Sequence, residues 1–330
     1  MHPALELAGI LAATTTRVGL RRLSIGALRP AWSLRAELYQ ALIRAATDRS
    51  RRRGIRWLRA MQEAEPVFLP GALAAVRFEP VVANRVPCAW ALPPGTSGGT
   101  TQRAVVYFHG GGYLIGSLAT HREIAARLAI GVGAPVLAVG YRLAPEHRFP
   151  AAHDDCLAAV RWLYGRGVPP AGVALAGDSA GGALSAATLL GLRDAGEPLP
   201  TAAVLLCPWV DPLADSGSMR TNERFDFGTR ALLRDWLEAY ASVELAADPR
   251  LTPLRADLTG LPPLLVQVGE AEMFLDQARA FAERARAAGV AVQLETYPDM
   301  FHDWQVQVTM VPEGAAAVAS IVRFLRSRLA

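Results

Sequence analysis

The sequence contains no lysine, and all 34 of its basic residues are arginine. It has only three cysteines, Cys88, Cys156 and Cys207, too few and too scattered for a disulfide framework or a zinc cluster. No apolar run reaches the ~18 residues that a membrane-spanning helix needs, and no basic segment precedes the apolar start of the chain. These absences exclude a P-loop, which requires lysine, and predict reduced thiols in a cytoplasmic protein without a signal peptide.

Charged residues are also scarce, at 19% of 330, while hydrophobic residues make up 52%, which favours a large buried core over disorder. The charge is unevenly distributed. Residues 1–60 hold twelve arginines and three acidic residues, a net +9, and because the whole chain carries +4, the remainder carries −5. Such a segment suits nucleic acid or an anionic membrane surface. No aromatic interleaving or nucleic-acid motif accompanies it, so a solvated helix face is favoured, with a membrane-associated lipase as an alternative.

Short β-branched runs alternate with helical stretches along most of the chain. Strands are predicted at 105–108, 135–141, 172–177, 202–207, 263–269 and 292–297. Helices are predicted between 31 and 65 and near 119–131, 151–164, 180–195, 229–241, 274–288 and 313–329. An antiparallel hairpin at about 76–92 leads into them. This pattern predicts an α/β fold with a mostly parallel sheet flanked by helices. In such a fold, ligands bind beyond the carboxyl ends of the strands.

One of those strand ends carries a candidate nucleophile. Residues 177–181 read Gly-Asp-Ser-Ala-Gly, which fits the G-x-S-x-G pattern between a strand and a helix. A turn this sharp requires residues with almost no side chain two before and two after the serine. It predicts that Ser179 is the nucleophile and that the N–H of Ala180 points into the same space.

A serine nucleophile needs a base, and the base needs an orienting carboxylate. In this fold the expected order along the chain is serine, acid, histidine, and His302 is the only histidine after Ser179. Glu270, Glu272 and Asp276 follow the strand that should carry the acid. Because Glu270 is close to the strand end and Asp276 falls in a helix's first turn, Glu272 is preferred, with Asp276 as the second choice.

The glycine-rich stretch His109–Gly112 follows another predicted strand. A dinucleotide-binding turn would need glycine at position 115, which is Ile115. An oxyanion hole fits better, because Gly111 and Gly112 have no Cβ to obstruct the approach of an oxyanion to their N–H groups.

Four motifs in this order resemble one known family. They are HGGGY (109–113), YRLAPEHRFPAAHDD (141–155), GDSAGG (177–182) and the late FHDW. Together they resemble the hormone-sensitive-lipase-like (bacterial family IV) carboxylesterases of the α/β-hydrolase superfamily. The resemblance implies a serine carboxylesterase that acts on short-chain or small-alcohol esters and uses no metal or organic cofactor. It also suggests a homodimer. It also implies a helical cap of residues 1–70 and about 211–245 over a catalytic domain spanning 71–330.

Several alternatives stay open at this point. Some relatives hydrolyse lactones or N-acetyl groups, and a non-catalytic small-ligand receptor on the same fold is a rival that the presence of His302 disfavours. The candidate residues for the substrate pocket are Tyr113, Asp178, Trp209, Phe225 and Met300.

Four residues near the middle of the chain are of types that bind metal ions: His147, His153, Asp154 and Asp155. Their spacing matches no metal signature, so we expect them to brace the loop against the sheet.

Overall fold

The computed structural model describes residues 3–64, 75–99 and 101–329. Its described part contains one eight-stranded sheet in the order β1-β2-β4-β3-β5-β6-β7-β8. The strands are β1 Arg77–Ala83, β2 Val86–Leu92, β3 Ala104–Phe108, β4 Val136–Val139, β5 Val173–Asp178, β6 Ala202–Leu206, β7 Leu264–Gly269 and β8 Val292–Tyr297. The β1–β2 and β2–β4 pairs are antiparallel, and the other neighbours are parallel. All six strands and the hairpin predicted from the sequence are present.

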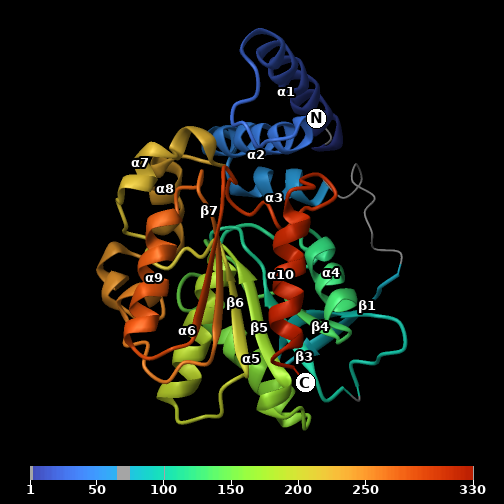
Figure 1. The fold of residues 1–330 in the computed structure, drawn as a ribbon, viewed down its shortest axis with the longest axis vertical. Helices are drawn as coiled ribbons and strands as arrows, with labels where there is room; N and C mark the ends of the chain where they lie inside the picture. The colour runs from blue at the N-terminus through green and yellow to red at the C-terminus, as the bar shows by residue number, and fades with distance from the viewer. Residues whose placement is uncertain (1–2, 65–74, 100, 330) are drawn as a thin grey trace.

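The central strands bury both faces, and alternate residues enter different cores. Val106 and Phe108 of β3 belong to one hydrophobic cluster, whereas Val105 and Tyr107 belong to another. The first cluster is completed by α5 Ala151–Gly165, α6 Ala180–Asp194 and α9 Leu275–Ala287. The second is completed by α4 Arg122–Val132 and α10 Gly314–Arg326, which contact each other (Figure 1). Helices therefore cover both faces of the sheet, as the parallel pattern predicts.

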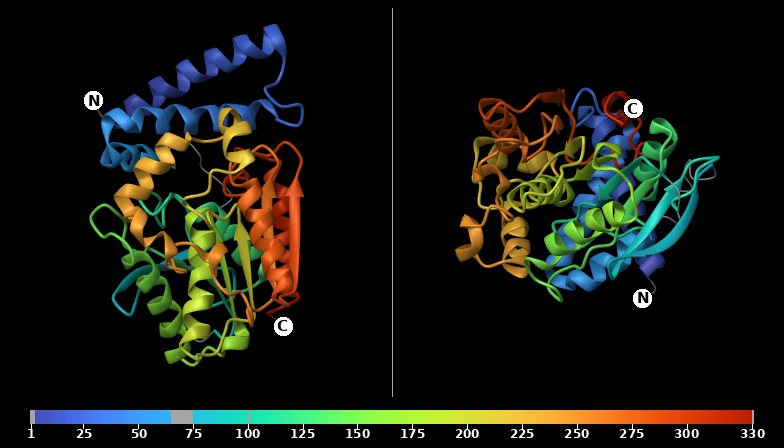
Figure 2. Two further views of the ribbon diagram at one scale, coloured as in Figure 1. Left: turned by 90° about the vertical axis from the view of Figure 1, so that its left-hand side faces the viewer. Right: turned by 90° about the horizontal axis from the view of Figure 1, so that it is seen from below.

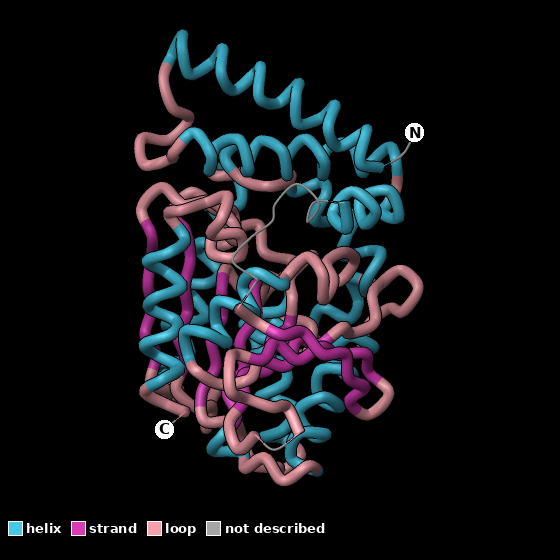
Figure 3. Tube along the Cα trace, turned by 90° about the vertical axis from the view of Figure 1, so that its right-hand side faces the viewer, coloured by secondary structure: helices cyan, strands magenta, loops and turns pink. Residues whose placement is uncertain are grey.

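A group of helices lies beyond one end of the sheet (Figures 1 and 2). It comprises α1 Pro3–Ile25, α2 Leu34–Arg53, α3 Ile55–Ala64, α7 Gly217–Thr221 and α8 Arg230–Tyr240. Figure 3 shows the three N-terminal helices gathered at that end of the molecule. Hydrogen bonds fasten α2 to the segment before α8: Gln40 Nε2 donates to the Asp226 carbonyl (3.0 Å) and Arg44 donates to the Gly228 carbonyl (2.7 Å).

Two helices of this group, α1 and α7, are not predicted by the sequence pattern. Helical periodicity was assigned only from residue 31, whereas α1 already spans Pro3–Ile25, and the short α7 was not predicted. The predicted domain boundary at 70/71 lies outside the described residues. Within the described part, no helix has both the length and the apolar character needed to cross a bilayer.

Candidate active site

Ser179 occupies a strained turn between β5 and α6. Its backbone has φ = 53° and ψ = −117°, values that a non-glycine residue adopts only where the surroundings force them. A Cβ on Gly177 would collide with the Gly181 carbonyl, and one on Gly181 would collide with the Phe108 carbonyl. The two glycines are therefore needed for the turn to close. Ala180 begins α6, whose N-terminal end carries partial positive charge.

The glycine loop after β3 lies beside this turn. Gly111 has φ = 110° and Gly112 has φ = 58°, and the Gly111 carbonyl accepts hydrogen bonds from the N–H groups of Leu114 and Ile115 (3.1 and 3.0 Å). A Cβ on Gly112 would collide with the indole of Trp236 on α8. Both glycines and Ser179 line one cavity. The loop thus brings bare backbone to the space in front of the serine.

His302, on the loop after β8, pairs with Glu272, which follows β7. The His302 Nδ1 lies 2.9 Å from Glu272 Oε2, and Glu272 Oε1 accepts a hydrogen bond from the Gly269 N–H (3.1 Å). Burial raises the pKa of Glu272, and His302 only partly offsets this. Burial disfavours the His302 cation, but the Asp303 and Glu272 carboxylates favour it, and the pKa of His302 rises well above its ordinary value.

The other ring nitrogen of His302 faces Asp303. The Nε2 lies 3.1 Å from Asp303 Oδ2, and burial raises the pKa of Asp303 to about 7. Within the described residues, no hydrogen bond joins Ser179 Oγ to His302. The rings of Phe227 and Phe274 each lie 4.8 Å from the imidazole, measured between centroids, and shield it from water on those sides.

The cavity that Ser179 and His302 line has both apolar and polar residues in its lining. Its apolar lining is formed by Ile43, Ile115, Trp209, Phe227, Leu233, Trp236, Phe274, Phe301 and Val306. Its polar lining includes Gln40, Thr47, Gln62, Thr120, His121, Asp178, Asp303 and Gln307. An apolar wall with a few convergent polar groups is typical of a small-molecule site.

A family model described as the alpha/beta hydrolase fold matches residues 105–306. An acetyl-hydrolase of Streptomyces hygroscopicus is 41% identical over 269 residues, which cover 81% of this chain and 88% of that protein. An ethyl acetate hydrolase of Pseudomonas putida is 36% identical over 72% of this chain and 77% of its own. A crystal structure described as an esterase from the bacterial hormone-sensitive lipase family superposes with a TM-score of 0.85 at 40% identity, covering 91% of this chain and 100% of that one.

The chain belongs to the hormone-sensitive lipase family of α/β-hydrolase esterases. The resemblance seen in its four motifs is thus confirmed.

In this esterase, six of the predicted site residues line the cavity: Ser179, His302, Gly111, Gly112, Asp178 and Trp209. Glu272 does not line it but contacts the His302 imidazole at Nδ1. Asp276 lies elsewhere. Its Oδ2 accepts a hydrogen bond from the Ser218 N–H of α7 (2.8 Å), so it fastens α9 to α7.

Three of the candidate pocket residues are not among those that line the cavity. The Tyr113 ring stacks on Tyr240 with centroids 4.0 Å apart and is buried in the main core. Phe225 is covered by the guanidinium of Arg224, 4.4 Å from its centroid, and Met300 is buried in a smaller core cluster. Tyr113 and Met300 were expected to line the pocket as residues beside strand ends, and Phe225 as a residue of the cap, but all three side chains pack elsewhere.

His121 was missed by the sequence reasoning. Its Nε2 lies 3.3 Å from Asp178 Oδ2, and Tyr107 donates a hydrogen bond to Asp178 Oδ1 (2.5 Å). Burial opposes the charge of Asp178, but His121 and Tyr107 stabilise it, and the pKa of Asp178 falls below its usual range. A lone histidine at the start of α4 carries no sequence signal of this pairing.

Asp155 and His153 make contacts that hold their segment in place. Asp155 accepts hydrogen bonds from the Arg142 N–H and guanidinium (both 2.8 Å at closest), and His153 Nε2 lies 3.2 Å from the Ala187 carbonyl. A different group of donors, Cys207, His302 and Asp303, brings a thiol, an imidazole and a carboxylate within 4.8 Å of one another.

Proposed function

We propose that this esterase hydrolyses small carboxylic esters through a covalent acyl-enzyme, with Ser179 as nucleophile, His302 as general base and Glu272 as the residue that orients the base. The observation that carries this proposal is the shared cavity: the strained Ser179 turn and the Glu272-bound imidazole of His302 face the same space. A carboxylate on Nδ1 fixes the tautomer in which Nε2 can accept a proton.

His302 Nε2 accepts and then returns a proton in each half of the reaction. In its neutral form, His302 Nε2 leaves Asp303 and takes the Ser179 proton as Oγ attacks the ester carbonyl, and it returns that proton to the departing alcohol. Water, deprotonated by the same nitrogen, then attacks the acyl-serine carbonyl, and the imidazolium returns that proton to Ser179 Oγ as the acid leaves. Catalytic hydrogen bonds are often long or misaligned before substrate binds, so the Asp303-bound arrangement of the imidazole is compatible with this sequence.

The developing oxyanion would be held by the N–H groups of Gly111, Gly112 and Ala180. The two glycines support this role because their positive φ angles bring backbone to the cavity without a Cβ. Donors fixed before the reaction begins stabilise the transition state more than the ground state.

A small acyl group suits the apolar residues of the cavity lining. Trp236 lies against Gly112, and Trp209, Phe227 and Phe274 crowd the space around Ser179 and His302. The names of the acetyl-hydrolase and ethyl acetate hydrolase relatives agree with acetyl esters as substrates. The acetyl-hydrolase name also supports N-acetyl hydrolysis as a second candidate.

The test compares the wild type with Ser179→Ala on p-nitrophenyl acetate, a lactone and an N-acetyl substrate. We expect Ser179→Ala to lower kcat by at least ~10³-fold, since loss of a triad member typically costs this much or more. Ser185→Ala, a buried serine on α6, the helix that follows the Ser179 turn, is the matched control and should keep most of the activity. Wild-type turnover by a folded Ser179→Ala variant would refute the mechanism.

A further inference from the structure

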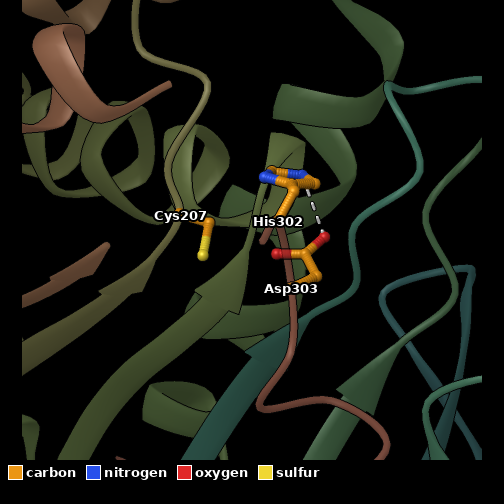
Figure 4. A group of neighbouring side chains, drawn as sticks. All are labelled: Cys207, His302 and Asp303. Carbon is orange, nitrogen blue, oxygen red and sulfur yellow. Dashed lines mark ion pairs between the residues drawn. The ribbon is translucent and has the colours of Figure 1, made fainter. Parts of the chain in front are cut away.

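Three side chains of types that bind metal ions lie close together at the proposed base, His302, and they come from two different loops. Cys207 directly follows β6, while His302 and Asp303 lie on the loop after β8. One donor atom of each lies within 4.8 Å of the other two. Figure 4 shows the three side chains as one group. None of the steps of ester hydrolysis uses the Cys207 thiol.

One carboxylate oxygen of Asp303 accepts no hydrogen bond from the described residues. Its Oδ2 lies 3.1 Å from His302 Nε2, but its Oδ1 is buried and has no hydrogen-bond partner among the described residues. In Figure 4 the oxygen without a dashed line lies on the side of Cys207. A buried carboxylate oxygen without a partner is costly in free energy, so this position favours a cation.

The donor set is that of a zinc site. Thiolate, imidazole and carboxylate together are the ligands that Zn²⁺ accepts, with three protein ligands and an open fourth position in sites that bind water. A point within about 2.8 Å of all three donor atoms must exist when none is more than 4.8 Å from another. Shifts of about 0.5–0.8 Å per donor would bring them to zinc bonding distance.

Neighbouring groups already orient two of these ligands. Because Glu272 Oε2 lies 2.9 Å from His302 Nδ1 and Asp303 Oδ2 lies 3.1 Å from Nε2, we infer that Nε2 is the nitrogen available to a metal; a carboxylate on the far nitrogen is the usual partner of a zinc-bound histidine. The Gln305 amide lies 3.7 Å from the Cys207 Sγ. Because His302 and Asp303 line the cavity, an ion can reach the group from it.

We propose that Cys207, His302 and Asp303 form an inhibitory binding site for Zn²⁺ or a similar thiophilic divalent cation. The ion takes the Nε2 lone pair of His302, so the imidazole no longer accepts the Ser179 proton. Binding also displaces the proton of the Cys207 thiol. The inhibition rests on the proposed role of His302 in catalysis, whereas the binding itself does not.

Binding is tested with Co²⁺ added to chelator-treated protein, because cobalt bound to a thiolate gives a near-ultraviolet charge-transfer absorption. We expect this absorption in the wild type and in Ser179→Ala, and its loss in Cys207→Ala, Cys207→Ser and Asp303→Asn. Cys156→Ala is the matched control, since Cys156 is another fully buried free thiol, and it should keep the absorption. Retention in Ser179→Ala separates this site from the catalytic mechanism.

Inhibition is tested with Zn²⁺ on ester hydrolysis, each variant being compared with its own zinc-free rate. The wild type and Cys156→Ala should be inhibited and restored by EDTA, and both Cys207 variants should need at least about tenfold more zinc for half inhibition. Absence of the cobalt–thiolate absorption in the wild type would overturn the proposal. Equal zinc sensitivity of folded Cys207 variants and the wild type would do the same.

Discussion

Glu272 and Asp276 are carboxylates four positions apart, and their surroundings give them different roles. Glu272 is fully buried and lies 2.9 Å from His302, whereas Asp276 binds the first turn of α7. The difference arises because Glu272 lies in the turn between the end of β7 at Gly269 and α9, while Asp276 lies in the first turn of α9.

We therefore expect Glu272→Gln to lower kcat by roughly 10³–10⁴-fold, because an amide on Nδ1 favours the wrong imidazole tautomer. Asp276→Asn is the matched control and should stay within about tenfold of wild type in kcat, since it acts on packing alone. Steady-state kinetics on p-nitrophenyl acetate measure both. A larger loss of kcat in Asp276→Asn than in Glu272→Gln would instead indicate that Asp276 is the acid of the triad.

Trp236 limits the space next to the glycine loop after β3. Its indole occupies the position that a side chain on residue 112 would need, and it lines the cavity with Leu233 from the same helix. We expect Trp236→Ala to raise the ratio of kcat/KM for p-nitrophenyl octanoate over acetate by about tenfold, as a larger apolar pocket buries more of the longer chain.

Trp162→Ala is the comparison for that experiment, because Trp162 packs on Trp90 and Arg166 and does not line the cavity. It should leave the chain-length ratio unchanged. An unchanged ratio in a folded Trp236→Ala variant would show that this tryptophan does not set the acyl limit.

At the scale of elements, α2 acts through its attachment to residues 223–228. The guanidinium of Arg44 donates to the carbonyls of Glu223 and Gly228, both at 2.7 Å, and to that of Asp226 at 3.1 Å. The same helix presents Tyr39, Gln40, Ile43 and Thr47 to the cavity. The attachment therefore fixes one wall of the substrate pocket.

Removing this attachment should affect stability and substrate binding together. We expect Arg44→Ala to lower the free energy of unfolding by about 1–3 kcal/mol, since buried carbonyls lose their donor, and to raise KM more than it lowers kcat. Arg52→Ala, an exposed position on the last turn of α2, is the control and should change neither. Urea unfolding and kinetics measure the two effects, and an Arg44→Ala protein identical to wild type in both would refute the attachment's role.

Element by element, the sequence predicted the sheet better than the pocket. Strands such as β3 and β7 are short apolar runs between turn residues, and the order of Ser179, Glu272 and His302 follows from the fold's topology. The cavity wall from α2 could not be predicted in this way. Periodicity identifies a helix there, but which face meets residues 223–228 depends on contacts between segments about 180 residues apart.

At the scale of the whole molecule, the basic N-terminal segment is largely paired within the chain. Arg29 binds Asp299, Arg51 binds Asp235, Arg53 binds Glu6 and Arg59 binds Glu146. Several of these partners belong to the acidic remainder of the chain. The charge asymmetry of the sequence thus joins the N-terminal helices to the rest of the protein, and the expectation of no nucleic-acid partner stays a prediction. The division at 70/71, the dimer and the cytoplasmic location stay predictions.

The groups around the cavity leave the sheet from separate strands: the glycine loop from β3, the serine turn from β5, Glu272 from β7 and His302 from β8. Each loop can accept substitutions while strand pairing keeps the other three in place. Evolution can therefore change which ester is accepted one loop at a time, and an engineer can recombine loops from relatives without rebuilding the reaction centre.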